Sequence, residues 1–451
     1  MADNVQLNQA AGSAGDVIAA DDIGGTKHQR VKVQHGADGS ATDASAANPL
    51  PVNLPGTSYD AFGRIRVSDP ITLFDSKQIH DTQALFWDDE ETSGSGTSTA
   101  HDADTAKTRI SVSATTAGTR VRQTFMRFNY QTGKSHLILM TGLISGSGSG
   151  ITGSMGYYDD SNGIFVKSED GTLYITRRTN VTGSAVDNDV AQSSWSGDKL
   201  DGSGASGYTL DPSKTQIFWI DLEWLGVGRV RCGFVIDGKF ILCHEFLNAN
   251  VLTEVYMSTP NLPLRYEISN DGTGGAAYVD HICSTVISEG GNSGTVGQIR
   301  SKNQGNAVSD CNVSGTYYAL VGIRLKAAYI GASTKITGIS ILSTSNDDVL
   351  WELRLNPSVA GTFTYADETN SAVQTVAGDT TNDPSTNTVT GGTVMRSGYL
   401  DSGGSVTILA DEQPIELGAA IDGTVDTIVL CVTPLGSNAD ISGAITWREV
   451  S

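Results

Sequence analysis

The chain has 451 residues, enough for two or three domains, and a net charge of −21 from 29 Lys and Arg against 50 Asp and Glu. Hydrophobic residues make up 38% and charged residues 18%, which is too apolar for a disordered chain, and no run is long enough for a membrane-spanning helix. The acidic balance argues against nucleic acid as a partner. Five scattered cysteines without CxxC spacing and the lack of an export signal predict synthesis and assembly in a reducing cytoplasm.

Residues 1–60 differ from the rest because they are rich in Ala, Gly, Ser and Asp and have one short alternating run. Three prolines near the end of this segment fix φ and favour an extended path. Such a segment cannot bury a core of its own, so it is either a floppy tail or an extended arm that orders against another subunit. The residues expected to make contacts in a docking arm are Val17, Ile18, Ile23, Arg30, Val31, Val33, Pro49, Pro51 and Pro55.

Short strands separated by turn residues follow, and residues 61–295 are predicted to form one β-sandwich. The turn Asp170-Gly171 predicts a hairpin that pairs Val166 with Ile175. The turn Asp237-Gly238 predicts a second hairpin that is apolar on both faces and pairs Phe234 with Ile241. Its register places Cys232 opposite Cys243, where two packed free thiols are favoured over a disulfide.

A polar stretch at 296–311 is predicted to be a linker, and residues 312–451 form a second alternating block. No helical period persists beyond a turn or two, and the segment that best fits a short helix is Asn248 to Met257. The sequence therefore predicts an all-β chain: an extended N-terminal arm, a jelly-roll sandwich and a second, C-terminal sandwich of jelly-roll type.

The run Phe218 to Glu223 contains two carboxylates on one face of a predicted strand, about 6.6 Å apart along the backbone. It resembles the ExDxE strand of laminarinase-like glycoside hydrolases, which share a concanavalin-like sandwich. By that resemblance Asp221 matches the helper carboxylate and Glu223 the acid/base, but the nucleophile position is Trp219. The alternative is that both acids face solvent or pair with Arg229 and Arg231 on the next strand. We therefore expect no enzymatic activity.

No other pattern assigns a catalytic, cofactor-binding or metal-binding residue. The run Asp159 to Gly163 is similar to a fragment of a calcium loop, but Tyr158 would take the first ligand position, so a plain turn is favoured. The seven histidines form no metal triad, and the glycines lack a phosphate-loop context, so no cofactor is expected. Three aromatic residues are candidates for stacking on sugars, with a core position as the alternative: Tyr157, Tyr158 and Trp195.

Several segments between about residues 10 and 290 resemble virion proteins of tailed bacteriophages. They are 15–32, the turn at 38–39, 48–52, 60–68, 75–78, 218–228 and 256–263. The C-terminal block is only generally similar to jelly-roll tips of phage fibres and decoration proteins. The resemblance does not decide between head and tail.

The resemblance implies a non-enzymatic virion component on the virion surface, a capsid-decoration protein, head fibre or tail appendage made in the bacterial host cytoplasm. It implies an oligomer, often a trimer, whose partners are other copies of the chain and other capsid or tail proteins. A tail-fibre adhesin that binds a host-surface glycan is the alternative, and a glycan depolymerase is the third hypothesis. Neither nucleic acid binding nor membrane insertion is expected.

Overall fold

The structure is a computed structural model. It describes residues 5–6, 17–18, 20–29, 31, 33–35, 42–47, 49, 69–144, 148–291, 296–378, 386–409, 415–437 and 439–450. The chain divides into two compact units, residues 1–67 and residues 68–451. Within the described ranges, no helix is long and apolar enough to cross a membrane.

The N-terminal unit contains antiparallel two-stranded ribbons. The β3–β4 turn has Gly24 and Gly25 at φ +64° and +84°, which a two-residue hairpin turn of this type requires. The hydrophobic clusters found among the described residues include none from this unit. The ribbons are β1 (Val5–Gln6) with β2 (Val17–Ile18), β3 (Ala20–Ile23) with β4 (Thr26–Gln29), and β5 (Gln34–His35) with β6 (Thr42–Asp43).

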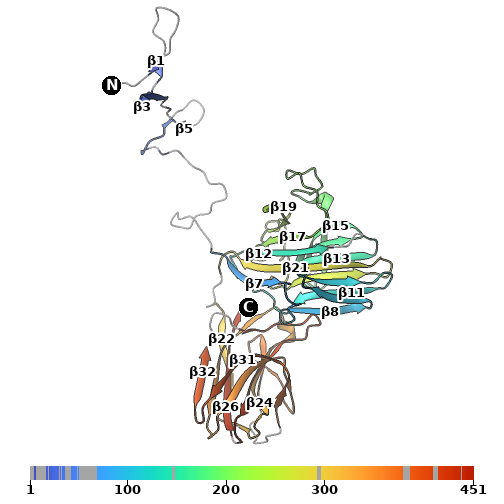
Figure 1. Cartoon of the computed structure of the whole chain (residues 1–451), viewed down its shortest axis with the longest axis vertical. Coiled ribbons are helices and arrows are strands. Elements are labelled where there is room, and N and C mark those ends of the chain that lie inside the picture. Colours follow the sequence, from blue (N-terminus) through green and yellow to red (C-terminus); the bar gives the residue numbers. More distant parts are fainter. Residues whose placement is uncertain are drawn as a thin grey trace, which may run out of the picture. The chain divides into compact units, whose positions relative to one another are not determined.

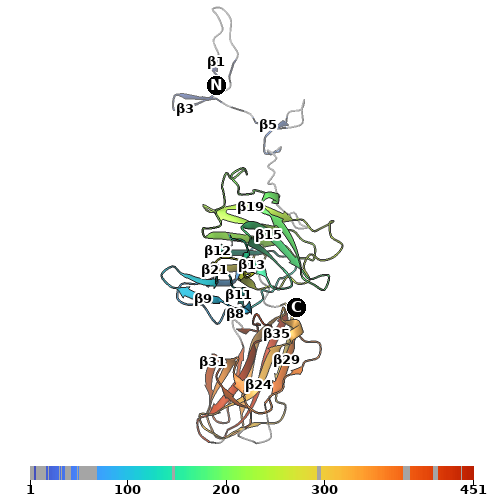
Figure 2. The same ribbon diagram turned by 90° about the vertical axis from the view of Figure 1, so that its right-hand side faces the viewer.

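The second unit begins with a β-sandwich made of two antiparallel sheets, named here by their central strands (Figures 1 and 2). In the β12 sheet the strand order is β19 (Lys239–Phe246), β18 (Val230–Ile236), β17 (Gln216–Leu222), β12 (His136–Ile144), β21 (Ala277–Ser288), β10 (Lys107–Val112) and β9 (Thr97–Asp102), and β7 (Ile71–Lys77) also pairs with β21. In the β13 sheet the order is β16 (Val186–Ala191), β15 (Thr172–Thr179), β14 (Gly163–Glu169), β13 (Ile151–Tyr158), β20 (Leu264–Asn270), β11 (Gly118–Thr124) and β8 (Trp87–Gly94). A short 3-10 helix, η1 (Gln192–Ser194), follows β16.

The C-terminal sandwich has the same construction. In the β25 sheet the order is β22 (Gln298–Asn303), β35 (Ala439–Val450), β25 (Ser333–Ser343) and β32 (Ser405–Leu409), with β23 (Ser309–Cys311) on β35 and β33 (Ile415–Glu416) on β25. In the β24 sheet it is β27 (Ser358–Val359), β30 (Thr388–Thr390), β24 (Tyr317–Leu325), β34 (Thr427–Pro434), β26 (Val349–Leu355) and β31 (Thr393–Leu400), with β29 (Val373–Ala377) on β24 and β28 (Ala366–Asp367) on β29. The 3-10 helix η2 (Ala327–Tyr329) follows β24.

Alternation of buried and half-exposed residues explains why these strands form. In β12, Ile138 and Met140 point into the first core while Leu137 and Leu139 lie on the other face. β35 alternates in the same way over most of its length. The all-β prediction is confirmed, and the facing antiparallel sheets of the first sandwich agree with the expected concanavalin-like arrangement.

The two predicted hairpins are confirmed in register at Val166–Ile175 and Phe234–Ile241. The pairing of Cys232 with Cys243 is wrong, because a β-bulge after Cys232 shifts the register and sets it opposite His244. Both thiols are free and buried, as expected.

Two further expectations are corrected. Residues 248–257 form turns and not a helix, since Asn250 has φ +59°, a left-handed conformation that stops a helix. The segment 296–311, predicted as a linker, contributes β22 and β23, and both pair with β35. The C-terminal sandwich therefore begins at least as early as Gln298.

Candidate functional site

The two carboxylates singled out in the sequence lie on the outer face of the β12 sheet. Phe218, Ile220 and Leu222 of β17 point into the hydrophobic core, so the alternate residues Trp219 and Asp221 face away from it. Glu223 follows directly after the strand, and its N–H donates to Arg229 O at 3.0 Å. The expectation that the two acids share a face holds.

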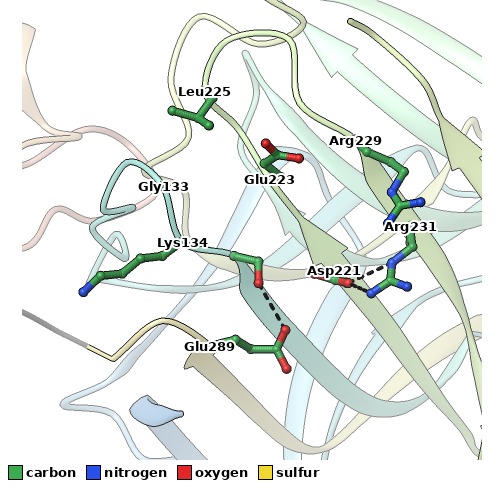
Figure 3. A pocket seen from close by; sticks show the side chains of 9 residues that line it. Gly133, Lys134, Asp221, Glu223, Leu225, Arg229, Arg231 and Glu289 are labelled. Carbon is green, nitrogen blue, oxygen red and sulfur yellow. Dashed lines mark hydrogen bonds and ion pairs between the residues drawn. The ribbon is translucent and has the colours of Figure 1, made fainter. Parts of the chain in front are cut away.

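A pocket of about 340 Å³ opens at this position (Figure 3). Its walls come from β17, from the start of β18, from the segment before β12 and from the end of β21. The charged and polar residues that line it are Lys134, Ser135, Asp221, Glu223, Arg229, Arg231 and Glu289.

Several charged side chains of this pocket already have partners. Arg231 Nε donates to Asp221 Oδ2 at 2.9 Å across the β17–β18 pair, which confirms the ion-pair interpretation for Asp221. Arg229 lies 3.5 Å from a carboxylate oxygen of Glu245. Ser135 Oγ donates to Glu289 Oε2 at 3.1 Å. The exposed Glu223 carboxylate makes no hydrogen bond or ion pair with the other residues drawn in Figure 3.

The nucleophile position of the glycosidase-like strand carries an inert side chain. The Trp219 ring is almost fully buried and packs edge-on against Phe240 with centroids 5.6 Å apart. Double-displacement hydrolysis of a glycoside needs a second carboxylate about 5–5.5 Å from the acid. An indole cannot take that role, and the Asp221 carboxylate is held by Arg231.

The three aromatic residues predicted to stack on sugars are all buried, at 0%, 1% and 2% exposure, and that prediction is wrong. The Tyr157 hydroxyl donates to Pro260 O at 2.8 Å inside the core. Tyr158 stacks on Phe165, and Trp195 Nε1 donates to Val190 O at 3.0 Å. Rings packed in this way have no face left for a sugar.

The predicted arm residues fall into two groups. Ile23, Val31 and Val33 are 64%, 76% and 53% exposed, Pro49 is exposed, and Ile18 is half-buried on the β1–β2 ribbon that also contains Val17. Arg30, Pro51 and Pro55 lie outside the described residues.

The described ranges hold no group of three His, Cys, Asp or Glu side chains that fits a metal ion. At Asp159–Gly163 the structure has the tight turn between β13 and β14, with Asp159 Oδ1 accepting from the N–H groups of Ser161 and Asn162 at 2.9 and 3.0 Å. The turn interpretation is therefore confirmed.

The sequence interpretation missed Arg127, which is buried just after β11 and lines a second, larger cavity. Nothing in its local pattern marks it, since a strand-like run with several arginines is usually a solvated face. Its position depends on loops that come from distant parts of the chain.

No protein-family model matches the chain, and no curated protein matches it. Solved structures similar to about half of the chain include a glycoside hydrolase family 16 endo-glucanase from Bacteroides ovatus, at 9% identity and TM-score 0.32, covering 48% of this chain and 99% of that one. A legume lectin-like domain from Entamoeba histolytica has 9% identity and TM-score 0.29, covering 47% and 95%. The CBM2 module of the evolved Dit of Lactobacillus casei BL23 phage J-1 has 4% identity and TM-score 0.34, covering 51% and 100%.

Proposed function

We propose that the chain is a non-enzymatic structural component of a tailed-phage virion, an oligomeric surface appendage that docks through its N-terminal arm and displays two β-sandwiches. It would be made in the host cytoplasm and join other virion proteins on the particle surface. The observation that carries the proposal is the N-terminal unit, whose described ribbons contribute to no hydrophobic cluster, and in which Ile23 on β3 and Val31 and Val33 between β4 and β5 are exposed.

The low stability of isolated two-stranded ribbons supports a docking role for this unit. An isolated two-stranded ribbon is marginally stable in water, and a partner surface that covers its apolar side chains and pairs its edges removes that weakness. The segment is also strongly polar between those side chains, so it stays soluble before assembly.

The test replaces the apolar contacts without shortening the chain. We expect the triple variant Ile23→Asp, Val31→Asp, Val33→Asp to fold normally in residues 68–451 and to be missing from purified particles. The matched control places the same charges at exposed positions of the same unit, Thr26, Ala46 and Ala47, and should still be incorporated. Normal incorporation of the triple variant, or of a chain lacking residues 1–67, would refute the docking role.

Immunogold labelling of particles with an antibody against residues 310–451 then separates head from tail. Gold over the head favours a decoration protein or head fibre, and gold at the tail favours an appendage in contact with the host. Release of reducing ends from a host polysaccharide by the purified chain would contradict the non-enzymatic role.

A second candidate function, a glycan-binding adhesin, is favoured by one observation. A cavity of about 580 Å³ in the second unit is lined by Tyr130, Trp224 and Tyr329 together with several amide and hydroxyl side chains. Ligand pockets for small molecules and sugars fall in this size range and combine apolar faces with a few polar groups.

A further inference from the structure

The cavity of about 580 Å³ lies where loops of the first sandwich meet the segment around η2 of the C-terminal sandwich. Its walls come from the segment after β11, from the β13–β14 turn, from residues 258–261 before β20 and from residues 328–332. Asn261 Nδ2 donates to Gly331 O at 2.9 Å and joins the last two walls.

Arg127 is the unusual residue of this cavity. It is 7% exposed, and its Nε and Nη1 are buried without a hydrogen-bond partner in the described structure. A guanidinium carries five N–H donors, and leaving buried charged donors unpaired costs free energy. Burial lowers the pKa of Arg127, and the nearby Asp159 carboxylate opposes that shift.

Asp159 is the nearest counter-charge, and the contact is loose. Arg127 Nε and Asp159 Oδ2 are 4.0 Å apart, too far for a direct hydrogen bond. The other oxygen, Oδ1, is already used by the turn N–H groups of Ser161 and Asn162. Arg127 can therefore donate a hydrogen bond to a ligand, and Asp159 Oδ2 can accept one.

A hydroxyl group matches this pair because it accepts one hydrogen bond and donates another. An anion matches it less well, since a carboxylate or phosphate cannot donate to Asp159 and is repelled by it. The pair is neutral as a whole, so no net charge draws an acidic ligand to it.

Aromatic side chains in the same cavity supply an apolar face. Tyr329 is 53% exposed, and the half-buried Trp224 is held by a hydrogen bond from its Nε1 to Met257 O at 3.1 Å. The Trp224 ring also packs edge-on against Tyr130, with centroids 6.4 Å apart. A pyranose ring has hydroxyl groups at its rim and C–H groups on its faces, so it fits both features.

We propose that this cavity binds a neutral pyranose unit of an oligosaccharide, with one sugar hydroxyl bridging Arg127 and Asp159 and the sugar ring against Tyr329. This inference rests on the second candidate function, glycan adhesion, and names its site and ligand class. It is independent of the docking role of the arm.

The experiment presents full-length protein to an array of immobilised neutral hexose and deoxyhexose oligosaccharides, with uronate-bearing oligosaccharides of the same lengths beside them. Titration calorimetry with the soluble form of the neutral oligosaccharide bound best then measures affinity. We expect neutral binding, and a loss of tenfold or more in Asp159→Asn and in Tyr329→Ala. Asp159→Asn keeps the Oδ1 acceptor of the turn, and Tyr329→Ala removes an exposed ring.

The matched controls are Asp221→Asn in the charged pocket and Tyr399→Ala, an exposed tyrosine on β31, and both should bind as the wild type does. If a melting curve shows that Asp159→Asn is unfolded, Tyr329→Ala alone decides. Neutral binding that neither cavity variant weakens would overturn the site and leave adhesion standing. Binding of uronate-bearing glycans only would overturn the ligand class, and binding of no glycan would overturn both the site and the adhesin function.

Discussion

His136 shows how a single buried side chain sets the response of this protein to acid. It is fully buried on β12, against the rings of Tyr130 and Tyr157. Burial lowers the pKa of His136 to about 4. The neutral imidazole is therefore the form that the fold accepts.

The sign of the pH effect follows from this shift. Between pH 6.5 and 4 the unfolded chain binds a proton at His136 that the folded chain does not, so stability falls as pH falls through this window. The full shift corresponds to about 3 kcal/mol. We expect His136→Phe to lose that share of the acid sensitivity when free energies of unfolding are measured by denaturant titration at pH 7 and pH 4.

The comparison with wild type removes the contribution of other buried groups. Burial raises the pKa of Asp89 and Asp426, and these shifts make stability rise as pH falls. The wild type and His136→Phe both keep these two carboxyl groups, so their effect cancels in the comparison. His80→Gln, at an exposed histidine, is the matched control. An acid sensitivity of His136→Phe equal to that of the wild type would contradict the assignment.

Single residues also mark the limit of prediction from sequence. Tyr157, Tyr158 and Trp195 are aromatic residues in polar surroundings, and chain order alone does not show which face of a sheet is covered. Arg127 is a charged residue whose local sequence favours a solvated face, but loops from distant parts of the chain bury it. Burial of individual polar and aromatic side chains depends on long-range packing, which a local pattern does not report.

At the scale of elements, turn chemistry was the most informative signal. Asp170 and Gly171 both have positive φ, at 50° and 78°, as the Asp-Gly hairpin turn requires, and the register followed correctly from it. Counting outward from the second turn failed at Cys232, since a bulge adds one residue to β19. Bulges have no strong sequence mark, so registers near a turn are more reliable than those far from it.

Gly233 lies directly after that bulge, and its lack of a side chain has a structural reason. A Cβ atom there would meet Ile241 O at 1.9 Å and Trp219 Nε1 at 3.0 Å. The first contact is with backbone of the paired strand, so relief requires the β18–β19 pairing to shift. We expect Gly233→Ala to lower the free energy of unfolding by about 3 kcal/mol or more, measured by urea denaturation.

Gly275 is the matched control for this prediction. It is exposed, and a Cβ atom there would meet no other atom within 4 Å. Gly275→Ala should therefore leave stability within about 0.5 kcal/mol of the wild type. If urea unfolds the two variants alike, the close approach of the Ile241 carbonyl does not constrain position 233.

For the whole molecule, the all-β fold class could be predicted from the sequence, but the start of the C-terminal sandwich and the contacts between the sandwiches could not. The polar sequence of residues 296–311 predicts a linker, and only pairing with β35, over a hundred residues later, makes β22 and β23 strands. The same long separation hides the junction of the two sandwiches within residues 68–451. There, Ala419 N donates to Phe125 O at 3.0 Å, and Ile421 N donates to Asp88 Oδ2 at 2.8 Å.

These bonds couple the two sandwiches, and Asp88 is the contact that can be removed without changing a backbone group. A partly buried N–H that loses a charged acceptor costs about 1–3 kcal/mol. We expect scanning calorimetry of residues 68–451 to show one transition for the wild type. In Asp88→Ala the two sandwiches should melt separately, with the C-terminal one shifted down by about 2–4 °C per kcal/mol lost.

Asp104→Ala, at an exposed turn aspartate, should keep the single transition. A single, unshifted transition in Asp88→Ala would mean that the sandwiches are coupled through other contacts.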